Sequence, residues 1–220
     1  MITVLGGIKG GSGKTTLSTN LCVIQASDGK RVLLVDADEQ QSASNWSEHR
    51  EGLDIDTPWT TISLFGSSVR SQVLKMKDHY DEIIIDVGGR DTTSQRAALT
   101  IADLLIAPFQ PRSLDVWTIG KLSSLLDDVC VINPNLKTYA VINRADSQGK
   151  DNKEAIDIIN ETGNILCLIE MVCQRKAFAN ASAEGMGVIE MTPQDKKAVD
   201  EIRNLSNAIF NIKTSLTTLK

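Results

Sequence analysis

Short apolar runs alternate with longer stretches of helical periodicity along the chain. The runs are rich in β-branched residues and are bounded by Gly, Pro, Asp or Asn, a pattern that predicts strands. They span residues 2–8, 31–36, 60–65, 81–86, 103–108, 138–143 and 164–170. Between them, apolar residues at helical spacing predict helices. These residues are Leu17, Leu21 and Ile24, then Val116, Ile119, Leu122, Leu125 and Leu126, and finally Ile202, Leu205 and Ile209.

This alternation predicts an α/β fold with a mostly parallel central sheet and helices on both faces. Strands separated by helices pair in parallel through right-handed crossovers, and strands covered on both sides need no polar face. With 220 residues and 41% hydrophobic composition, the chain can bury one sizeable core, so we expect a single domain over residues 1–220. Ligands of such folds bind at the carboxyl ends of strands.

Composition narrows the classes of function. A net charge of -5, from 28 acidic and 23 basic residues, excludes a protein coated with DNA-binding charge but permits a local basic patch. The cysteines form no CxxC pair, so we expect buried reduced thiols rather than disulfides or a thiolate metal site. They are Cys22, Cys130, Cys167 and Cys173. The opening run lacks a basic leader, and no stretch approaches the ~20 apolar residues of a membrane span. We therefore expect a cytoplasmic protein.

The segment "GGSGKTT", residues 10–16, lies between a predicted strand and a predicted helix. In this context, glycines bring backbone N–H groups close to phosphate oxygens, and the helix contributes its positive end. The residues expected to bind a nucleotide here are Gly10, Gly11, Ser12, Gly13, Lys14, Thr15 and Thr16. Lys14 would lie against the β- and γ-phosphates, and the Thr15 hydroxyl would bind Mg²⁺. An ordinary glycine turn capped by Ser12 is the alternative.

The loop does not fit the strict GxxxxGK[ST] string, because Ile8 stands where the first glycine should be. The actual string, K-G-G-S-G-K-T-T from Lys9, resembles the ParA/MinD family of deviant Walker A ATPases, and most of all the small plasmid-type ParA partition proteins. The resemblance implies a P-loop NTPase fold. It also implies that Lys9 crosses a sandwich dimer to the partner's phosphates, while Lys14 serves its own nucleotide. A solvated loop lysine is the alternative for Lys9.

Two further strand ends carry carboxylates. Asp36 and Asp38 alternate along "VDAD", so they are predicted to face alike. The family pattern D-x-D-P-Q implies that Asp38 lies near Mg²⁺ and the attacking water, although Glu39 replaces the proline here. A simple cap of the strand end is the alternative for both aspartates.

In the run "DEIIIDVGGRD", Asp86 lies at the end of a predicted strand. An aspartate in this position completes the Mg²⁺ coordination shell together with the Thr15 hydroxyl. Many ParA relatives carry prolines after this aspartate, so the double glycine predicts a looser switch loop. Arg90 and Asp91 are expected to form an ion pair within the loop or to be exposed to solvent, rather than to be catalytic.

The stretch "YAVINRAD" places Asn143 and Arg144 where the base of the nucleotide would lie. N-R-A-D is close to the guanine motif N-K-x-D, whereas Asn can also pair with adenine. The family resemblance favours ATP, and GTP stays open. A turn after a strand is the structural alternative.

Two more segments, "PFQPRSLDVW" and "CQRKAFANASAEGMGVIE", extend the resemblance over nearly the whole chain. The first implies that Pro108, Pro111 and Asp115 lie near the nucleotide. A strand terminator, with a helix cap at Ser113 or Asp115, is the alternative. The first predicted strand begins at residue 2, which leaves no room for an N-terminal helix-turn-helix.

The resemblance implies a DNA-partition ATPase that hydrolyses ATP weakly alone. Lys9, Lys14 and Asp38 would be catalytic, and Thr15, Asp38 and Asp86 would hold Mg²⁺. The ATP-bound homodimer would bind nonspecific DNA on the nucleoid, and a ParB-like centromere-binding partner would stimulate hydrolysis. Candidate DNA-contacting residues are Arg175, Lys176, Lys196, Lys197, Arg203 and Lys213.

Two other classes stay open. A MinD-like membrane-cycling ATPase would need a basic amphipathic tail. The tail "NAIFNIKTSLTTLK" contains only two lysines, so we expect it to pack against the domain, with no stable membrane association. A nonenzymatic nucleotide-holding scaffold is the other class, which the presence of Asp38 and Asp86 disfavours.

Overall fold

A computed structural model describes residues 1–111, 118–146 and 151–211. The strands are β1 (Ile2–Leu5), β2 (Val32–Ala37), β3 (Thr60–Ser63), β4 (Glu82–Val87), β5 (Leu104–Phe109), β6 (Lys137–Ala145), β7 (Leu166–Cys167) and β8 (Val172–Cys173). The helices are α1 (Lys14–Ser27), α2 (Ser42–Gly52), α3 (Ser68–Met76), α4 (Thr93–Leu99), α6 (Ile119–Cys130), α7 (Asp151–Glu161), α8 (Lys176–Ala183) and α9 (Lys196–Phe210), with a short 3₁₀ turn η1 (Lys77–His79) after α3.

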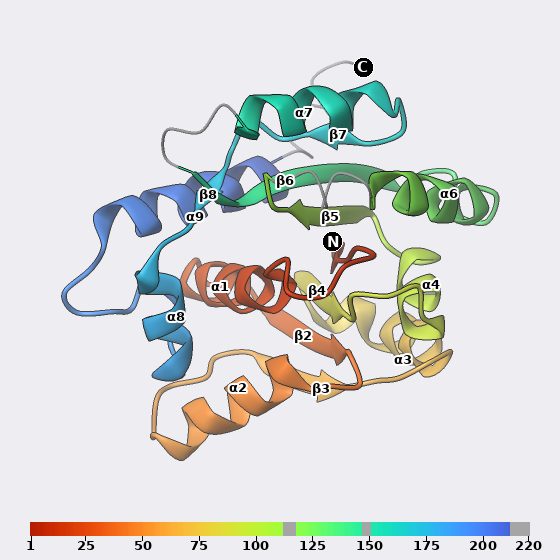
Figure 1. The fold of residues 1–220 in the computed structure, drawn as a ribbon. Helices are drawn as coiled ribbons and strands as arrows, with labels where there is room; N and C mark the ends of the chain where they lie inside the picture. The colour runs from red at the N-terminus through yellow and green to blue at the C-terminus, as the bar shows by residue number, and fades with distance from the viewer. Residues whose placement is uncertain (112–117, 147–150, 212–220) are drawn as a thin grey trace.

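The strands form one sheet in the order β3-β2-β4-β1-β5-β6-β7, and β8 pairs with β6 (Figure 1). Every pairing among the described strands is parallel. In the register of β2 and β4, Asp36 lies opposite Asp86. The predicted α/β fold with a parallel sheet is therefore confirmed, and the carboxyl ends of the central strands meet at one edge.

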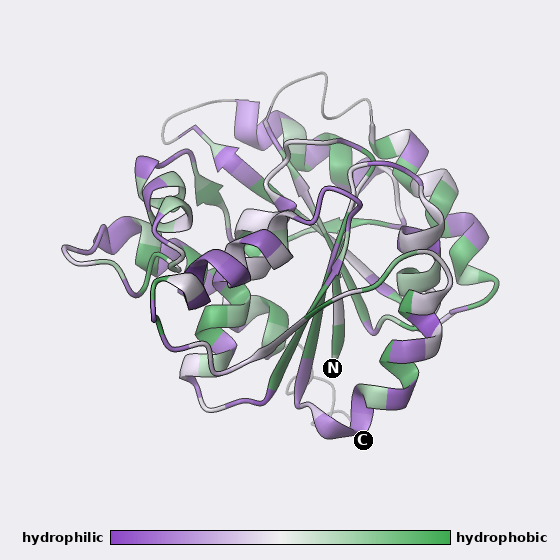
Figure 2. Ribbon diagram, turned by 90° about the horizontal axis from the view of Figure 1, so that it is seen from below, coloured by the Kyte–Doolittle hydropathy of each residue, from purple (hydrophilic) through white to green (hydrophobic). Residues whose placement is uncertain are grey.

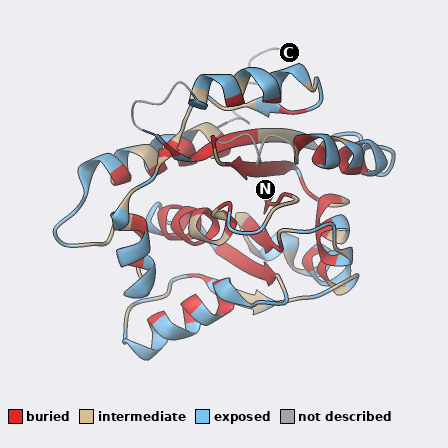
Figure 3. Ribbon diagram, in the orientation of Figure 1, coloured by how far each residue is buried: buried red, intermediate tan, exposed pale blue. Residues whose placement is uncertain are grey.

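Helices cover both faces of the sheet. The core on one face is closed by α3, α4, α6 and α7, and the core on the other face by α1, α2, α8 and α9. Seen from below, the apolar strands run between these two layers (Figure 2). Strands β2 and β5 are buried along their whole length (Figure 3). Their near-continuous apolar sequences follow from this double coverage.

The ends of the sheet differ from the sequence prediction. The first strand stops at Leu5 rather than residue 8, because the chain leaves the sheet at Gly6 to form the glycine loop. A side chain at Gly6 would come within 2.8 Å of the Leu105 Cδ1 atom. The run at 164–170 yields only the two-residue β7. The second short strand, β8, was not predicted at all.

Cysteine burial also differs from the expectation. All four cysteines are free, but only Cys22 is buried; Cys130 is exposed, and Cys167 and Cys173 are half-buried. In the C-terminal region, Ile209 and Phe210 pack in the core as expected, whereas residues 212–220 lie outside the described part of the chain. Within the described residues, no helix combines the length and apolar character needed to cross a bilayer.

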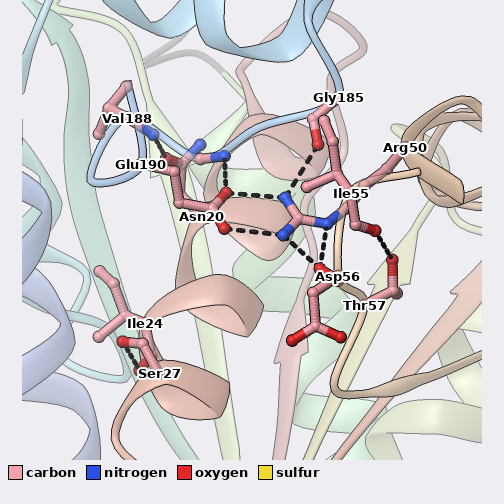
Figure 4. Close-up of polar contacts among 11 residues, drawn as sticks. Asn20, Ile24, Ser27, Arg50, Ile55, Asp56, Thr57, Gly185, Val188 and Glu190 are labelled. Atoms are coloured by element: carbon pink, nitrogen blue, oxygen red, sulfur yellow. Dashed lines mark hydrogen bonds and ion pairs between the residues drawn. The ribbon is translucent and has the colours of Figure 1, made fainter. Parts of the chain in front are cut away.

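A buried arginine of α2 binds the segment that follows α8 (Figure 4). The Arg50 guanidinium donates two hydrogen bonds of 2.8 Å to Glu190 and one of 3.0 Å to the Gly185 carbonyl. Trp59 lies 4.8 Å from this guanidinium and stacks on Trp46. Because α2 begins directly after the turn that carries Asp38, this network holds one wall of the candidate site in place.

Candidate functional site

The turn between β1 and α1 has the backbone of an anion-binding loop. Gly11 and Gly13 adopt positive φ angles of 75° and 93°, which glycine reaches without steric cost. A Cβ atom at Gly13 would lie 2.1 Å from the Asn143 Nδ2 atom. No side chain caps α1, so the N–H groups of its first turn are available to an anion.

A cavity of 570 Å³ opens beside this loop, at the carboxyl ends of the central strands. Its lining combines the glycine loop, the turn after β2, the loop after β4 and one residue of β6. The lining residues are Gly10, Gly11, Gly13, Lys14, Thr15, Thr16, Ala37, Asp38, Glu39, Gln40, Ser42, Gly88, Gly89, Arg90, Thr92, Ser94 and Arg144. Most of the residues that the sequence predicts to bind phosphate or metal are therefore brought together here.

Lys14 lies at the base of this cavity and is only 6% exposed. Its Nζ atom donates to the Lys9 carbonyl at 3.0 Å. Burial lowers the pKa of Lys14, while the carboxylates of Asp86 and Asp38 oppose this shift. An anion bound in the cavity would favour the charged ammonium further.

Thr15 and Asp86 are in direct contact. The Thr15 hydroxyl donates to Asp86 Oδ2 at 2.7 Å, and the Ser18 hydroxyl donates to Oδ1 at 3.1 Å. Burial raises the pKa of Asp86 to about 7, although both hydroxyls and the Lys14 ammonium oppose this effect. Sequence reasoning missed Ser18; its position one helical turn after Lys14 was the available signal.

Asp36 and Asp38 do not present their carboxylates together, contrary to the sequence expectation. Asp36 is fully buried and accepts the N–H groups of Ser44 at 2.8 Å and Asp38 at 3.1 Å. It caps the turn between β2 and α2, as the structural alternative had it. Because β2 ends at Ala37, the chain bends before Asp38. Only Asp38 then lines the cavity, facing Gly88.

The loop after β4 is packed tightly against the glycine loop. A Cβ atom at Gly89 would lie 2.4 Å from the Gly10 nitrogen and 2.5 Å from the Lys9 carbonyl carbon. Gly89 therefore permits a close contact between the two loops, a role that the sequence did not predict; the expected looseness of the switch loop stays a prediction. Of the two alternatives for Arg90 and Asp91, the ion pair is wrong, because Asp91 binds Arg96 at 2.7 Å. Solvent exposure is confirmed for both residues, and Arg90 also lines the cavity.

Asn143 and Arg144 lie within β6, beside the glycine loop. The Asn143 amide donates to the Ser12 carbonyl at 2.7 Å. Arg144, with a positive φ of 54°, lines both the first cavity and a neighbouring one of 410 Å³. Phe178 also lines this second cavity; its place in the quoted "QRKAF" segment was the signal that sequence reasoning did not use for a binding role.

Ser12 and Lys9 are predicted site residues whose side chains do not line the cavity. Ser12 is 4% exposed, and its hydroxyl has no hydrogen-bond partner among the described residues. Lys9 is half-buried and meets Lys14 through its backbone carbonyl. In the proline-rich segment, Gln110 donates to the Gly11 carbonyl at 3.0 Å, which joins this segment to the glycine loop.

The other residues singled out in the proline-rich segment can be placed only in part. Pro108 lies within β5, and Pro111 is buried just after it. Neither lines the first cavity. The helix-capping candidates Ser113 and Asp115 lie outside the described residues.

Comparison with known proteins decides the family. A sequence profile described as "CobQ/CobB/MinD/ParA nucleotide binding domain" matches residues 3–188. The chain belongs to the ParA/MinD family of nucleotide-binding ATPases. One relative, "Maintenance of carboxysome distribution protein A" of Halothiobacillus neapolitanus, is 28% identical over 92% of this chain and 93% of its own length.

Solved structures of this ParA/MinD fold superpose over most of the chain. An Asp-to-Ala variant of Cyanothece McdA in complex with ATP matches with a TM-score of 0.76 and 17% identity, covering 94% of this chain and 95% of that protein. A putative plasmid partition protein of Borrelia burgdorferi bound to AMPPNP matches with a TM-score of 0.72 and 20% identity, covering 92% and 96%. These likenesses support the fold assignment.

The oxygen ligands of the site fit Mg²⁺. Among the described residues, no group of three or more His, Cys, Asp or Glu side chains could enclose a metal. Mg²⁺ in nucleotide sites needs no such cage, because phosphates and waters complete its octahedral shell. The contact between the Thr15 hydroxyl and the buried Asp86 carboxylate supplies hard oxygen ligands where a cation would also offset the burial of Asp86.

The predicted DNA-contacting residues fare unequally. Arg175 donates to Glu201 at 3.0 Å and is half-buried, so its charge is paired within the protein, and its contact with DNA stays a prediction. Lys176, Lys196, Lys197 and Arg203 are exposed. Lys213 lies outside the described residues.

Proposed function

We propose that this chain is an ATPase that partitions DNA, and that it switches between a nucleotide-free monomer and an ATP-bound sandwich dimer. One observation carries the proposal: Thr15 contacts Asp86 at the start of an uncapped helix, and Asp38 lines the same cavity. This arrangement suits a magnesium-bound nucleoside triphosphate with a polarised water beside it.

Each residue has a distinct task in this proposal. The N–H groups of residues 10–16 and the Lys14 ammonium hold the phosphates. Thr15 and Asp86 hold Mg²⁺, which neutralises developing charge on the phosphates when bound. Asp38 orients the attacking water, and Lys9 reaches the partner subunit's nucleotide, as an arginine finger does elsewhere. Arg144 lies beside the second cavity, where ATP would place its base.

DNA binding follows from the dimer. The chain carries a net charge of -5, so one copy has little general affinity for a polyanion. A dimer would place two sets of the exposed side chains Lys176, Lys196, Lys197 and Arg203 side by side, and their phosphate contacts would weaken steeply with salt. The ATP-bound form would then lie on the nucleoid until a ParB-like partner stimulates hydrolysis.

A second candidate function is the positioning of a large protein assembly. It is favoured by the carboxysome-distribution relative, which covers 92% of this chain at 28% identity. The two candidates share the nucleotide cycle and differ in the cargo that the partner carries. For the membrane-cycling alternative, the tail residues 212–220 that it requires lie outside the described part of the chain.

DNA binding under three nucleotide conditions tests the proposal. With Mg²⁺ present, the protein should retain duplex DNA on filters with ATP, and poorly with ADP or without nucleotide. Asp38→Ala should bind ATP and DNA yet release phosphate at least ~100-fold more slowly, because the attacking water is no longer oriented. Equal DNA affinity in all three conditions would refute the ATP-driven cycle.

The partner separates the two cargo classes. A centromere-binding protein encoded beside this chain that stimulates phosphate release supports DNA partition. Stimulation only by a protein without DNA affinity supports the second candidate. If the protein floated with anionic liposomes only when ATP is present, this result would contradict both candidate functions and indicate a membrane cycle.

A further inference from the structure

Arg90 occupies a place that the sequence did not assign to it. It follows Gly88 and Gly89 at the carboxyl end of β4 and lines the same cavity as Lys14, Thr15 and Asp38. Sequence reasoning treated Arg90 and Asp91 as a loop ion pair or as solvent-exposed residues, with no role in the site. The structure gives Asp91 a different partner, and Arg90 is an exposed residue on the lining of the cavity.

The backbone on both sides of Arg90 is fixed to the glycine loop. On one side, Gly89 packs against the Lys9–Gly10 peptide so closely that a Cβ atom would approach the Gly10 nitrogen to 2.4 Å. On the other, the Thr92 hydroxyl accepts the Gln95 N–H at 3.1 Å. The Gln95 side-chain oxygen in turn accepts the Gly7 N–H at 3.1 Å. The position of Arg90 relative to the loop is therefore set before any ligand binds.

The neighbouring charges are arranged so that Arg90 is not neutralised. Both oxygens of Asp91 accept hydrogen bonds of 2.7 Å from Arg96, which also reaches Asp128 at 3.1 Å. Across residues 1–111, 118–146 and 151–211, the structure records no hydrogen bond or ion pair for the Arg90 side chain. Meanwhile the cavity contains the carboxylates of Asp38 and Glu39, so a polyphosphate needs more positive charge than Lys14 provides.

We propose that the Arg90 guanidinium contacts the γ-phosphate of the nucleotide bound to its own subunit and makes the site favour a triphosphate over a diphosphate. The planar guanidinium suits two oxygens of one phosphate. Gly88, two residues before Arg90, lies against Asp38, the residue assigned to the attacking water. Because Arg90 lines the same cavity, it lies near the end of the cavity where the γ-phosphate would be. This inference rests on the proposed function, because it takes the cavity to hold ATP.

Binding of ADP and of the slowly hydrolysed analogue ATPγS tests the proposal without any hydrolysis. Each nucleotide is titrated into the protein in a calorimeter, with Mg²⁺ present, at a protein concentration where sedimentation shows a monomer. Arg90→Ala should weaken ATPγS binding about 10- to 100-fold, the loss of a charged hydrogen-bonded contact, and leave ADP binding within about twofold. Arg90→Lys should recover part of the ATPγS affinity but not all of it, because an ammonium cannot bind two oxygens in the plane of a guanidinium.

Arg70→Ala is the matched control. Arg70 is an exposed arginine that binds the Thr100 hydroxyl at 2.8 Å, outside the nucleotide cavity, so both affinities should match wild type. Equal loss of ADP and ATPγS affinity in Arg90→Ala, or no loss of either, would overturn the proposal while wild type still preferred ATPγS. If wild type bound neither nucleotide, the proposed function would fail first.

Discussion

At the scale of single residues, Gly89 shows how one missing side chain shapes the site. It adopts no unusual φ angle, yet an added Cβ would collide with the backbone of Lys9 and Gly10. We expect Gly89→Ala to push the switch loop away from the glycine loop and weaken nucleotide binding about 10-fold or more, the cost of a displaced charged contact. Fluorescent nucleotide titration measures this change.

The control for this substitution is Gly120→Ala in α6. Apart from the adjacent residues and the backbone of α6 itself, no atom of the described residues lies within 4 Å of the Cβ position at Gly120, so this variant should bind nucleotide as wild type does. It should also unfold at a slightly higher temperature, because alanine favours a helix over glycine by about 0.5–1 kcal/mol. If Gly89→Ala matched it in nucleotide affinity, the contact between the two loops would have no role in binding.

Residues differ in how far the sequence could predict them. The glycine loop, Lys14 and Thr15 were predictable because a contiguous motif between a strand and a helix fixes their geometry. Arg90 was not, because its availability depends on Arg96, five residues after Asp91, taking the Asp91 carboxylate. The prediction that Asp36 and Asp38 face alike was wrong because side chains alternate with period two only within a strand. Strand β2 ends at Ala37, between the two aspartates.

At the scale of elements, helix α2 was not predicted from the sequence for a physical reason. Helix α2 buries Ser44, Ser47 and Arg50 along with Ala43 and Trp46, so its inward face is largely polar and shows no apolar period. These polar groups are satisfied by partners far away in sequence. By contrast, α6 buries five apolar residues at helical spacing, and its existence was predicted.

A second element-scale feature joins β8 to α9. The Glu201 carboxylate accepts a hydrogen bond of 3.0 Å from the Arg175 guanidinium and one of 3.1 Å from the Cys173 N–H group. Burial would raise the pKa of Glu201, but these hydrogen bonds outweigh it, so the pKa lies below its usual value. A carboxylate with a lowered pKa in the folded state stabilises the protein above its unfolded-state pKa of 4.5, and this contribution is lost as pH falls through the lowered value.

We therefore expect Glu201→Gln to reduce the free energy of unfolding at pH 7 by about 1–3 kcal/mol, the worth of hydrogen bonds to a charged group. Below the folded-state pKa, the wild-type carboxyl is neutral as well, so the two proteins should converge. Urea unfolding across pH 3–7 measures the difference. As a comparison, Asp200→Asn alters an exposed neighbour on α9 and should show no such pH-dependent gap; a gap for Glu201→Gln that stayed constant with pH would contradict the ionic origin.

At the scale of the whole molecule, the two lysines of the loop separate binding from association. Lys14 is buried at the base of the cavity, and its ammonium donates to the Lys9 backbone carbonyl. Lys9→Ala keeps that carbonyl, so the monomer should bind ATP nearly as wild type does. Lys14→Ala removes the buried ammonium itself and should abolish binding.

Loss of the Lys9 side chain is expected to affect dimer formation more strongly than ATP binding by the monomer. If Lys9 neutralises the partner subunit's triphosphate, its loss leaves that negative charge uncompensated in the interface, which costs about 2–5 kcal/mol. In an Asp38→Ala background, where hydrolysis does not reset the protein, ATP should produce a dimer in sedimentation velocity. Adding Lys9→Ala should weaken that dimer about 30-fold or more, as this cost implies. An undiminished dimer in the double variant would mean that association does not depend on a lysine contributed in trans, and the sandwich arrangement would have to be replaced by one in which each site is complete within its own subunit.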